Sequence, residues 1–340
     1  ALPICKTVLR SANCLRALVG FGWWGQNIAR AVQGKSDRLR FKMAVTKTPS
    51  ATQALADSLG LPQISDETAA WSDPEVQAVV LATPHSLHAD QIVAAAKSGK
   101  HVFCEKPLAL NHADALRAIE ACRSRGLSLG VGQNKRFWPS MVKLREIVAS
   151  GVLGEILHLE GHYSNQHSSQ FFSDWRASPI ESPAGGLTGT GIHIVDAFVG
   201  LAGPARRVQA RVHSTRSGPD PRDATAVMIE FASGLQGYFA MIRATPLYWR
   251  VHVFGDRASV EALGENEVVV RYEGGRTERH TFNAVDSLRV ELDAFADSIP
   301  RPGHTPRPYP IGMDEMGHGI ALFEAIVKSI DGQTHVEVSQ

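Results

Sequence analysis

The sequence predicts an α/β protein that begins with a doubly wound parallel sheet and continues into an α+β domain with a large, mostly antiparallel open sheet. Up to residue 133, short apolar runs alternate with helical segments, the order of right-handed strand–helix–strand crossovers. From residue 155 onward, strand-like segments follow one another closely, with turn signals at 233–234 and 274–275. Because 340 residues exceed the usual size of one domain, we predict two, at 1–133 and 134–340, with residues 1–14 as an extension.

The elements expected in the first domain alternate in type. The predicted strands are residues 17–19, 41–45, 76–82, 101–104 and 128–131, and the predicted helices are 26–33, 51–59, 89–97 and 113–125. Three of these helices end directly before or at a glycine-containing turn, which is a common helix stop signal. This alternation is typical of a sheet with helices on both faces.

The second domain is expected to be richer in strands. The predicted strands are residues 155–163, 208–213, 224–231, 235–242, 251–254 and 268–272, with helices beginning near residue 192 and spanning 314–330. Five prolines between Pro300 and Pro310 exclude a regular element there. One face of the resulting sheet must be covered by helices or by another subunit.

Composition narrows the possible function classes. The chain has 35 Lys and Arg against 34 Asp and Glu, spread along the sequence, so its formal net charge is +1. Nucleic acid and membrane surfaces are therefore not expected partners. The four cysteines form no CxxC pair, and no apolar run is long enough to cross a bilayer. We expect a soluble, cytoplasmic protein.

An apolar strand leads directly into the loop Gly20-Phe21-Gly22-Trp23-Trp24-Gly25 and then into a helix. In this context the glycines predict a dinucleotide-binding loop of the Rossmann type. The first glycine permits a tight turn, the second lets the backbone approach a pyrophosphate, and the third lets the helix pack closely on the strand. The amides at the helix start would then meet the negative charge. An ordinary glycine turn is the alternative, but the strands that follow favour a cofactor.

The end of the second predicted strand bears on the choice of cofactor. An acidic residue about 20 positions after the glycines favours NAD, whereas a cation there accommodates the 2′-phosphate of NADP. This chain has Thr46-Lys47-Thr48 at that point and no carboxylate. We therefore expect NADP in preference to NAD, the alternative being that Lys47 is an ordinary solvated lysine.

Two further loops leave the carboxyl ends of predicted strands, where ligands of open parallel sheets bind. The first, Ala82-Thr83-Pro84-His85-Ser86-Leu87-His88, should border the dinucleotide. The second, Glu105-Lys106-Pro107, should lie beside the nicotinamide ring. A like charge and partial desolvation there would disfavour the ammonium form of Lys106 and make it a better proton shuttle. On composition alone, both loops would be ordinary turns.

Taken together, the motifs resemble a known family. They are TPxSxxH at residues 83–88, GKHVFCEKPLAL at 99–110, GVGQNKRF at 130–137, Trp175-Arg176, and GGLTGTGIHIVD at 185–196. These segments resemble the glucose-fructose oxidoreductase, inositol dehydrogenase and rhizopine catabolism family, called Gfo/Idh/MocA, along nearly the whole chain. The resemblance implies a two-domain NAD(P)-dependent oxidoreductase of sugars, cyclitols or their derivatives. It also implies a homodimer or homotetramer formed through the open sheet.

The resemblance implies roles for individual residues. Lys106 matches the family's catalytic lysine, which commonly precedes a cis proline, and His193 matches the histidine that exchanges a proton with the substrate hydroxyl. Positions that line the cofactor or substrate site in the family are matched by Glu105, Asn134, Trp175 and Arg176, and the histidine of the nicotinamide-side loop by His88.

One position departs from the family pattern. The family's frequent catalytic aspartate lies four residues before the histidine, where this chain has Gly189. Its role is then absent, taken over by Thr188, Thr190 or Asp196, or supplied by the substrate.

The residues around His193 indicate a site independently of the resemblance. His193 and Asp196 are three positions apart, so they share one face of the helix that begins near residue 192. The positive end of the helix dipole favours a neutral imidazole, as a proton acceptor requires. We predict that Asp196 is catalytic and orients His193; the alternative is a pair that only fixes the helix start.

Other side chains complete the predicted site. Tyr163 and Trp175 are predicted to supply apolar faces for a sugar ring, and Arg136 is predicted to bind the substrate. His158 and His162, four apart on a predicted strand, would be about 13 Å apart and could not share an ion. With His167 as the only further histidine nearby, no metal site is expected.

The predicted function is hydride transfer between a nicotinamide and a secondary alcohol or ketone of a sugar-like substrate. His193 would take the hydroxyl proton while Lys106 polarises the same oxygen. Two alternatives stay open. One is a dinucleotide-binding regulatory or redox-sensing protein with little turnover, suggested by Gly189, and the other is a dehydrogenase of a non-sugar ring diol.

Overall fold

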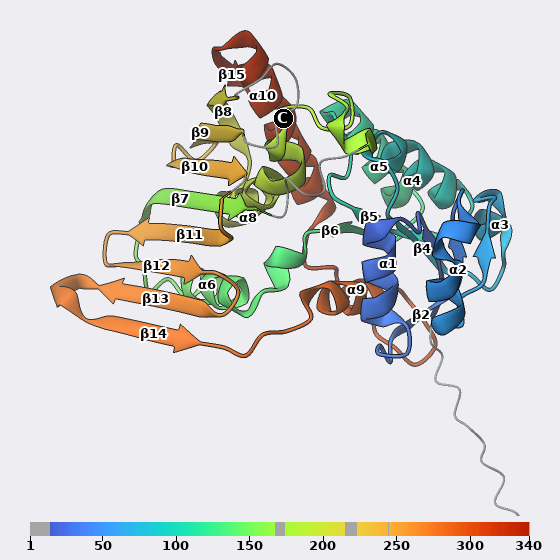
Figure 1. Cartoon of the computed structure of the whole chain (residues 1–340). Coiled ribbons are helices and arrows are strands. Elements are labelled where there is room, and N and C mark those ends of the chain that lie inside the picture. Colours follow the sequence, from blue (N-terminus) through green and yellow to red (C-terminus); the bar gives the residue numbers. More distant parts are fainter. Residues whose placement is uncertain (1–13, 167–173, 215–222, 244, 340) are drawn as a thin grey trace, which may run out of the picture.

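The computed structural model describes residues 14–166, 174–214, 223–243 and 245–339 and consists of two sheets with their own helices (Figure 1). The first sheet has six parallel strands in the order β3-β2-β1-β4-β5-β6. The second has nine strands in the order β14-β13-β12-β11-β7-β10-β9-β8-β15. Both parts of the predicted fold class are therefore confirmed. His167 and residues 1–13 of the predicted extension at 1–14 lie outside the described residues.

The parallel sheet and its helices follow the predicted alternation. Its strands are β1 (Cys14–Val19), β2 (Leu39–Val45), β3 (Gln63–Ile64), β4 (Ala78–Leu81), β5 (His101–Glu105) and β6 (Leu129–Gly132). Its helices are α1 (Trp23–Val32), α2 (Pro49–Ser58), α3 (Thr68–Ser72), α4 (His88–Lys97) and α5 (His112–Arg123), with a 3₁₀ turn, η1, at His85–Leu87. Strands β2 and β3 are added on one side of β1, whereas β4 pairs with β1 on the other side, so the strand order reverses between β1 and β4. In open parallel sheets, ligands bind at the carboxyl ends of the strands at such a point.

The second sheet is mixed rather than wholly antiparallel, because β7 and β10 pair in parallel while the other neighbours run antiparallel. Its strands are β7 (Ile156–Asn165), β8 (Ala205–His213), β9 (Ala224–Phe231), β10 (Gln236–Arg243), β11 (Tyr248–Gly255), β12 (Ala258–Leu263), β13 (Glu267–Tyr272), β14 (Thr277–Thr281) and β15 (His335–Glu337). Strands β12, β14 and β15 have no counterpart among the predicted strands. The short β15 pairs with β8 at the edge, far from its own end of the sequence.

Helices cover one face of the nine-stranded sheet. They are α6 (Pro139–Ala149), α8 (Ile192–Ala202) and α10 (Met313–Gly332), and α10 packs on α5 of the first domain as well as on α8 and β8 (Figure 1). Five large apolar side chains on the strands remain exposed, namely Leu157, Val212, Met228, Tyr238 and Tyr248. The segment with five prolines forms no helix or strand, as predicted.

The core of the parallel sheet takes residues from beyond position 133. Helix α9 (Ser287–Asp297) contributes Leu292, Phe295 and Ala296, and the segment that follows contributes Tyr309 and Met316. The Tyr309 hydroxyl donates to the carbonyl of Val131 at 2.8 Å. The end of the chain therefore returns to the first sheet and fixes one domain against the other. No helix within the described ranges is both long and apolar enough to span a membrane.

Candidate active site

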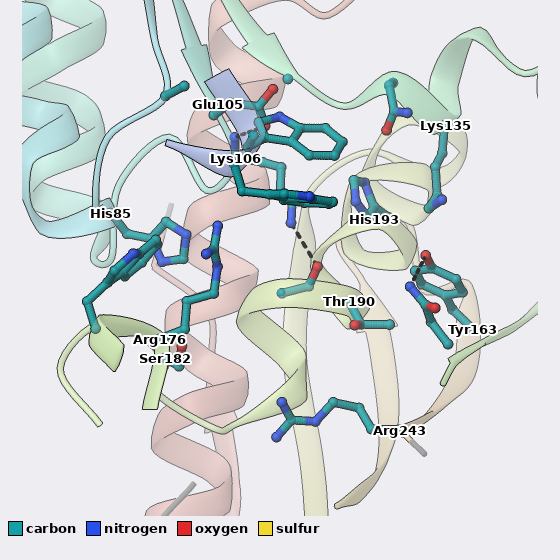
Figure 2. Close-up of a pocket in the computed structure, with 18 of the residues that line it drawn as sticks. His85, Glu105, Lys106, Lys135, Tyr163, Arg176, Ser182, Thr190, His193 and Arg243 are labelled. Carbon is teal, nitrogen blue, oxygen red and sulfur yellow. Dashed lines mark hydrogen bonds between the residues drawn. The ribbon is translucent and has the colours of Figure 1, made fainter. Parts of the chain in front are cut away.

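A cavity of about 480 Å³ lies where the carboxyl ends of the parallel strands face the second domain (Figure 2). The predicted site residues that line it are Trp23, Trp24, Ala82, Thr83, His85, Glu105, Lys106, Asn134, Tyr163, Trp175, Arg176 and His193. They follow β1, β4, β5 and β6 on one side and belong to β7, η3 (Asp174–Ala177) and α8 on the other. Residues up to 170 positions apart in the sequence are thus brought to one space, as the motifs predicted.

The glycine loop has the geometry that a dinucleotide requires. Gly20 has a φ of +96°, a conformation that favours glycine, and a Cβ at Gly25 would collide with the carbonyl of Gly20. At Gly22, by contrast, a Cβ would meet nothing within 4 Å, and no side chain caps the first turn of α1. Backbone amides in the first turn of a helix, beside open space, are the donor set that binds a pyrophosphate. The residues present therefore fit a dinucleotide, and Gly20, Phe21, Gly22 and Gly25 would hold its phosphates although they do not line the cavity itself.

The segment after β2 lies beside this loop. The amide of Gly20 donates to the carbonyl of Val45 at 3.0 Å, so Thr46 and Lys47 follow directly from the residue that holds the first glycine. Thr46 is buried, while Lys47 and its ammonium are exposed to solvent. The amide of Thr48 donates to Oγ1 of Thr46 at 3.3 Å, which orders the turn. An exposed lysine at this position is accessible to a 2′-phosphate.

Lys106 lies at the centre of the cavity. It follows the last residue of β5, and its peptide bond to Pro107 is cis, as the family resemblance implied. Its Nζ donates to the carbonyl oxygen of Gly189 at 2.8 Å (Figure 2). Burial lowers the Lys106 pKa to about 8, against the opposing effect of the neighbouring Glu105. Near neutral pH this ammonium is therefore able to release and regain a proton.

Glu105 is buried directly behind Lys106. Burial raises its pKa to about 7, although the Lys106 ammonium and the Arg176 guanidinium both favour the carboxylate. Its Oε2 accepts a hydrogen bond from the backbone amide of Lys106 at 3.3 Å. Both side chains therefore change protonation state near neutral pH, although Nζ of Lys106 bonds to Gly189 and not to this carboxylate.

His193 is held in one tautomer by Gln133 and not by Asp196. The Nδ1 atom of His193 lies 2.7 Å from Oε1 of Gln133. Because an amide oxygen only accepts, Nδ1 carries the hydrogen and Nε2 keeps a free lone pair. Burial, with the positive charges of Lys106 and Lys135, lowers the His193 pKa well below its usual value. The ring is therefore a neutral proton acceptor at neutral pH.

The prediction that Asp196 orients His193 is wrong. Asp196 turns away from the cavity and accepts two hydrogen bonds from the guanidinium of Arg136, the shorter one 2.6 Å from Nε. Arg136 also forms an ion pair with Glu315 on α10. The prediction that Arg136 binds substrate is wrong for the same reason, since its guanidinium is buried against Asp196 and Glu315 and neither Arg136 nor Asp196 lines the cavity. Residues three apart on a helix share a face, but the sequence does not show which partner occupies that face.

The place of the family aspartate is taken by a backbone carbonyl. Gly189 lies in a π-helical turn, η4 (Leu187–Gly191), and its carbonyl oxygen accepts a hydrogen bond from Nζ of Lys106. Of the residues that could have replaced the aspartate, Thr188 is buried with its hydroxyl donating to the Pro183 carbonyl at 2.6 Å, and Asp196 is bound to Arg136. Thr190 alone of these lines the cavity.

The loop after β4 is pinned by the second domain. Nδ1 of His85 lies 2.7 Å from the carbonyl oxygen of Glu181, and the carboxylate of Glu181 accepts from the amide and hydroxyl of Ser86. Trp175 meets the His85 ring edge-on at 5.0 Å between centroids. These contacts hold residues of the second domain against the loop that is predicted to border the dinucleotide.

His88 does not reach a cofactor directly. Its ring is completely buried, and its two nitrogens lie 2.8 and 3.1 Å from the carbonyl oxygens of Pro107 and Thr83. The predicted contact between His88 and the cofactor is therefore wrong, and His88 instead ties the loop after β4 to the one that carries Lys106. Pro84, which lies between Thr83 and His88 in the sequence, is also outside the cavity lining.

Three functional residues escaped the sequence reasoning. Lys135 and Arg243 line the cavity, and Gln133 orients His193. Gln133 and Lys135 were within the quoted GVGQNKRF motif, but the 3₁₀ turn η2 (Asn134–Phe137) decides which side chains face inward. Because such a turn has no simple inside–outside alternation, the motif indicated the location without indicating the orientation. Arg243 ends a strand whose preceding sequence gave no sign of a site.

No cluster of metal-binding side chains occurs in the part of the chain that the structure describes. The ring of His158 contacts that of Tyr238 and the ring of His162 contacts that of Tyr248 on the second sheet, and neither histidine lines the cavity.

Comparison with known proteins agrees with the geometry. Residues 15–133 match the model of an oxidoreductase family with an NAD-binding Rossmann fold, and residues 141–261 match the GFO/IDH/MocA C-terminal domain. The chain belongs to the Gfo/Idh/MocA oxidoreductase family. One Gfo/Idh/MocA relative, D-xylose 1-dehydrogenase (NADP(+)) 2 of Haloferax volcanii, is 30% identical over 84% of this chain and 88% of its own length.

Two further comparisons extend along nearly the whole chain. Inositol 2-dehydrogenase of Rhizobium meliloti is 24% identical over 95% of this chain and 98% of its own. A solved structure of levoglucosan dehydrogenase with NADH and levoglucosan superposes with a TM-score of 0.84, covering 96% of this chain and all of that one at 22% identity. At this identity the structural likeness shows that the Gfo/Idh/MocA fold is shared.

Proposed function

We propose that this oxidoreductase transfers a hydride between the nicotinamide of NAD(P) and a secondary alcohol or ketone of a sugar, cyclitol or sugar derivative. The observation that carries the proposal is that Lys106 and His193 line one cavity at the carboxyl edge of the parallel sheet. The first has a pKa near neutrality, and the second presents a free Nε2 lone pair. Relatives named as xylose and inositol dehydrogenases support a sugar-like substrate.

Each residue has a defined task in this reaction. A bound nicotinamide supplies the carbon that accepts or donates the hydride. In the direction of oxidation, Nε2 of His193 accepts the hydroxyl proton while Nζ of Lys106 donates a hydrogen bond to the same oxygen. Glu105 favours the ammonium form of Lys106 that donates this hydrogen bond, and Gln133 holds the imidazole in the required tautomer. Closure of the cavity by the loop at Glu181 keeps water from the transferring hydride.

Several of the remaining predicted residues would contact the cofactor. Trp23 and Trp24 stand between the glycine loop and the cavity, and Asn134 is held by a hydrogen bond to Ser287 at 3.2 Å. Trp175 stacks beneath the guanidinium of Arg176 at 4.2 Å, forming a flat wall against which a ring could pack.

The preferred cofactor in this proposal is NADP. The exposed Lys47, with Thr46 and Thr48 beside it, supplies a cation and hydroxyls, and the described segment after β2 provides no carboxylate until Asp57. The D-xylose 1-dehydrogenase relative of Haloferax volcanii is named for NADP(+). Calorimetry should therefore show tighter binding of NADP than of NAD, and Lys47→Asp should reverse that order. Equal affinities in the wild-type protein would contradict the assignment.

A second copy of the chain is proposed to cover the open face of the nine-stranded sheet. The exposed side chains of Leu157, Met228, Tyr238 and Tyr248 lie on central strands of that sheet, and no helix of the described chain covers them. Light scattering should give the mass of a dimer or tetramer.

The replacement Lys106→Ala tests the enzyme against the redox-sensor alternative. We expect the variant to bind NADP with nearly unchanged affinity but to lose turnover by about 10²-fold or more, since a general acid–base group is removed. The assay is nicotinamide absorbance with a panel of sugars and cyclitols. Cofactor binding without turnover by the wild-type protein on any polyol would favour the sensor, and unchanged turnover by the variant would refute the mechanism.

A further inference from the structure

Lys135 is a charged group of the cavity that the proposed reaction does not use. Its side chain extends from η2 toward the space between His193 and Tyr163 (Figure 2). The residue is only 9% exposed. Its Nζ lies 3.9 Å from the ring centroid of Trp138 and 4.6 Å from that of Tyr163. An ammonium held this way has ring faces on one side and the cavity on the other.

No carboxylate within the described ranges forms an ion pair with Lys135. Arg243, by contrast, is bound by Asp223 through two hydrogen bonds of 2.9 and 2.8 Å. Ring faces stabilise a desolvated cation by about 2 kcal/mol, which falls short of what removing an ammonium from water costs. The structure thus keeps a buried basic group beside the reacting groups that Glu265 and Glu291 favour in its charged form without either carboxylate contacting it.

A second donor faces the same space. The hydroxyl of Tyr163 accepts a hydrogen bond from Nδ2 of Asn165 at 3.2 Å, so its own hydrogen is free to point into the cavity. Both Tyr163 and Asn165 line that cavity. An ammonium and a phenolic hydroxyl on neighbouring sides of one space match the two oxygens of a carboxylate.

We propose that Lys135 and Tyr163 form a carboxylate subsite, so that the preferred substrate is a sugar acid rather than a neutral sugar. This inference rests on the proposed hydride transfer, because it assigns the substrate class of the same cavity. A phosphate fits less well, since two negative charges and three terminal oxygens require more donors than one ammonium and one hydroxyl supply. A neutral hydroxyl would leave the buried charge of Lys135 uncompensated.

The titration of Lys135 agrees with this assignment. Burial lowers its pKa to about 7, an effect that Lys106 reinforces and that Glu265 and Glu291 oppose, and the neutral His193 adjoins it. A bound carboxylate would favour the ammonium and raise this pKa. Affinity for a sugar acid should therefore be highest below about pH 7 and weaken as the pH rises above it, because the free protein then loses the proton that the anion needs.

The test compares acids with neutral sugars of the same stereochemistry. The pairs are D-glucuronate with D-glucose, D-galacturonate with D-galactose, and D-gluconate with D-glucitol. Binding to the NADP-loaded protein is measured by calorimetry, and kcat/KM is measured by nicotinamide absorbance. We expect at least one acid to exceed its neutral partner by about tenfold or more in both affinity and kcat/KM, as a charge-assisted hydrogen bond implies.

Three variants assign that preference to the subsite. Lys135→Met keeps the length of the side chain and removes the charge, and Lys135→Arg keeps the charge. We expect Lys135→Met to lower kcat/KM for the acid at least about tenfold more than for its neutral partner, mainly through KM, and Lys135→Arg to retain most of the preference. The exposed Lys97→Met is the control for loss of one positive charge, and unchanged NADP affinity shows that each variant is folded.

The outcomes separate the subsite from the reaction. Turnover of neutral sugars without a Lys135-dependent preference for the acid would overturn the subsite and leave the proposed function intact. Binding of an acid that depends on Lys135, without turnover of any compound, would support the subsite and count against hydride transfer. If no acid bound at all, or if Lys135→Met weakened both members of a pair equally, the carboxylate subsite would be refuted.

Discussion

Replacing Gln133 should change the pH dependence of catalysis without touching the reacting atoms. In the wild-type protein, Oε1 of Gln133 fixes the hydrogen of His193 on Nδ1 through a bond of 2.7 Å. Gln133→Met removes that acceptor and leaves both tautomers accessible. A hydrogen bond of this kind contributes about 0.5–1.5 kcal/mol, so its loss should lower kcat by about two- to tenfold, with a smaller change in KM.

Gln133→Glu tests the same contact by placing a negative charge beside His193. A carboxylate beside Nδ1 favours the imidazolium and raises the His193 pKa, which burial holds well below its usual value in the wild-type protein. A proton acceptor with a raised pKa is protonated over more of the acidic range. The acidic limb of the kcat/KM profile for alcohol oxidation should therefore move to higher pH, measured between about pH 5 and 9.

Asp196→Asn is the matched control for these two variants, because it alters the residue that spacing alone would have assigned to the histidine. Since Asp196 binds Arg136 and not His193, the acidic limb of its profile should stay in place. A shifted limb in Asp196→Asn, together with unchanged profiles in both Gln133 variants, would refute the assignment of Gln133 as the positioning residue.

Two further predictions concern the surroundings of the site. Gly189→Asp places a carboxylate near Nζ of Lys106, at a position where a Cβ meets nothing within 4 Å. This carboxylate should raise the Lys106 pKa by about one unit or more, and the basic limb of the pH–rate profile should shift with that pKa. An unmoved limb would contradict the contact between Lys106 and residue 189. Arg136→Leu leaves Asp196 and Glu315 without their shared partner and should lower the free energy of unfolding by about 3–5 kcal/mol in urea titration, whereas a loss below about 1 kcal/mol would show that these buried ion pairs do not stabilise the fold.

The general position of the site could be predicted from the sequence because it depends on local patterns. The glycine loop, the loop after β4 and the Glu105-Lys106 turn each directly follow an apolar strand, and parallel strands bring their carboxyl ends to one edge. The helix bearing His193 also begins at the predicted residue. These features need only the strand and helix pattern, together with the direction of each crossover.

Contacts between side chains distant in sequence could not be predicted in this way. Gln133 and His193 are 60 positions apart, as are Arg136 and Asp196, and in both pairs the partner depends on how η2 turns. Helix α9 joins the first core although it follows the second sheet, because the chain returns across the domain boundary. Periodicity shows that a helix has an apolar face, but not which of two sheets will cover it.

Gly189 shows how a missing side chain can set the chemistry of a site. Its φ is not in the positive range and a Cβ would meet no neighbour, so backbone geometry does not require glycine there. Its effect is electrostatic: Lys106 receives a neutral carbonyl as its partner instead of a second carboxylate, and its pKa stays at about 8. The same absence leaves Glu105 as the acidic side chain among the cavity-lining residues. A carboxylate at position 189 would repel an anionic substrate held by Lys135, so Gly189→Asp should impair sugar acids more than neutral sugars. Equal losses for both members of each sugar pair would separate the role of Gly189 from the choice of substrate.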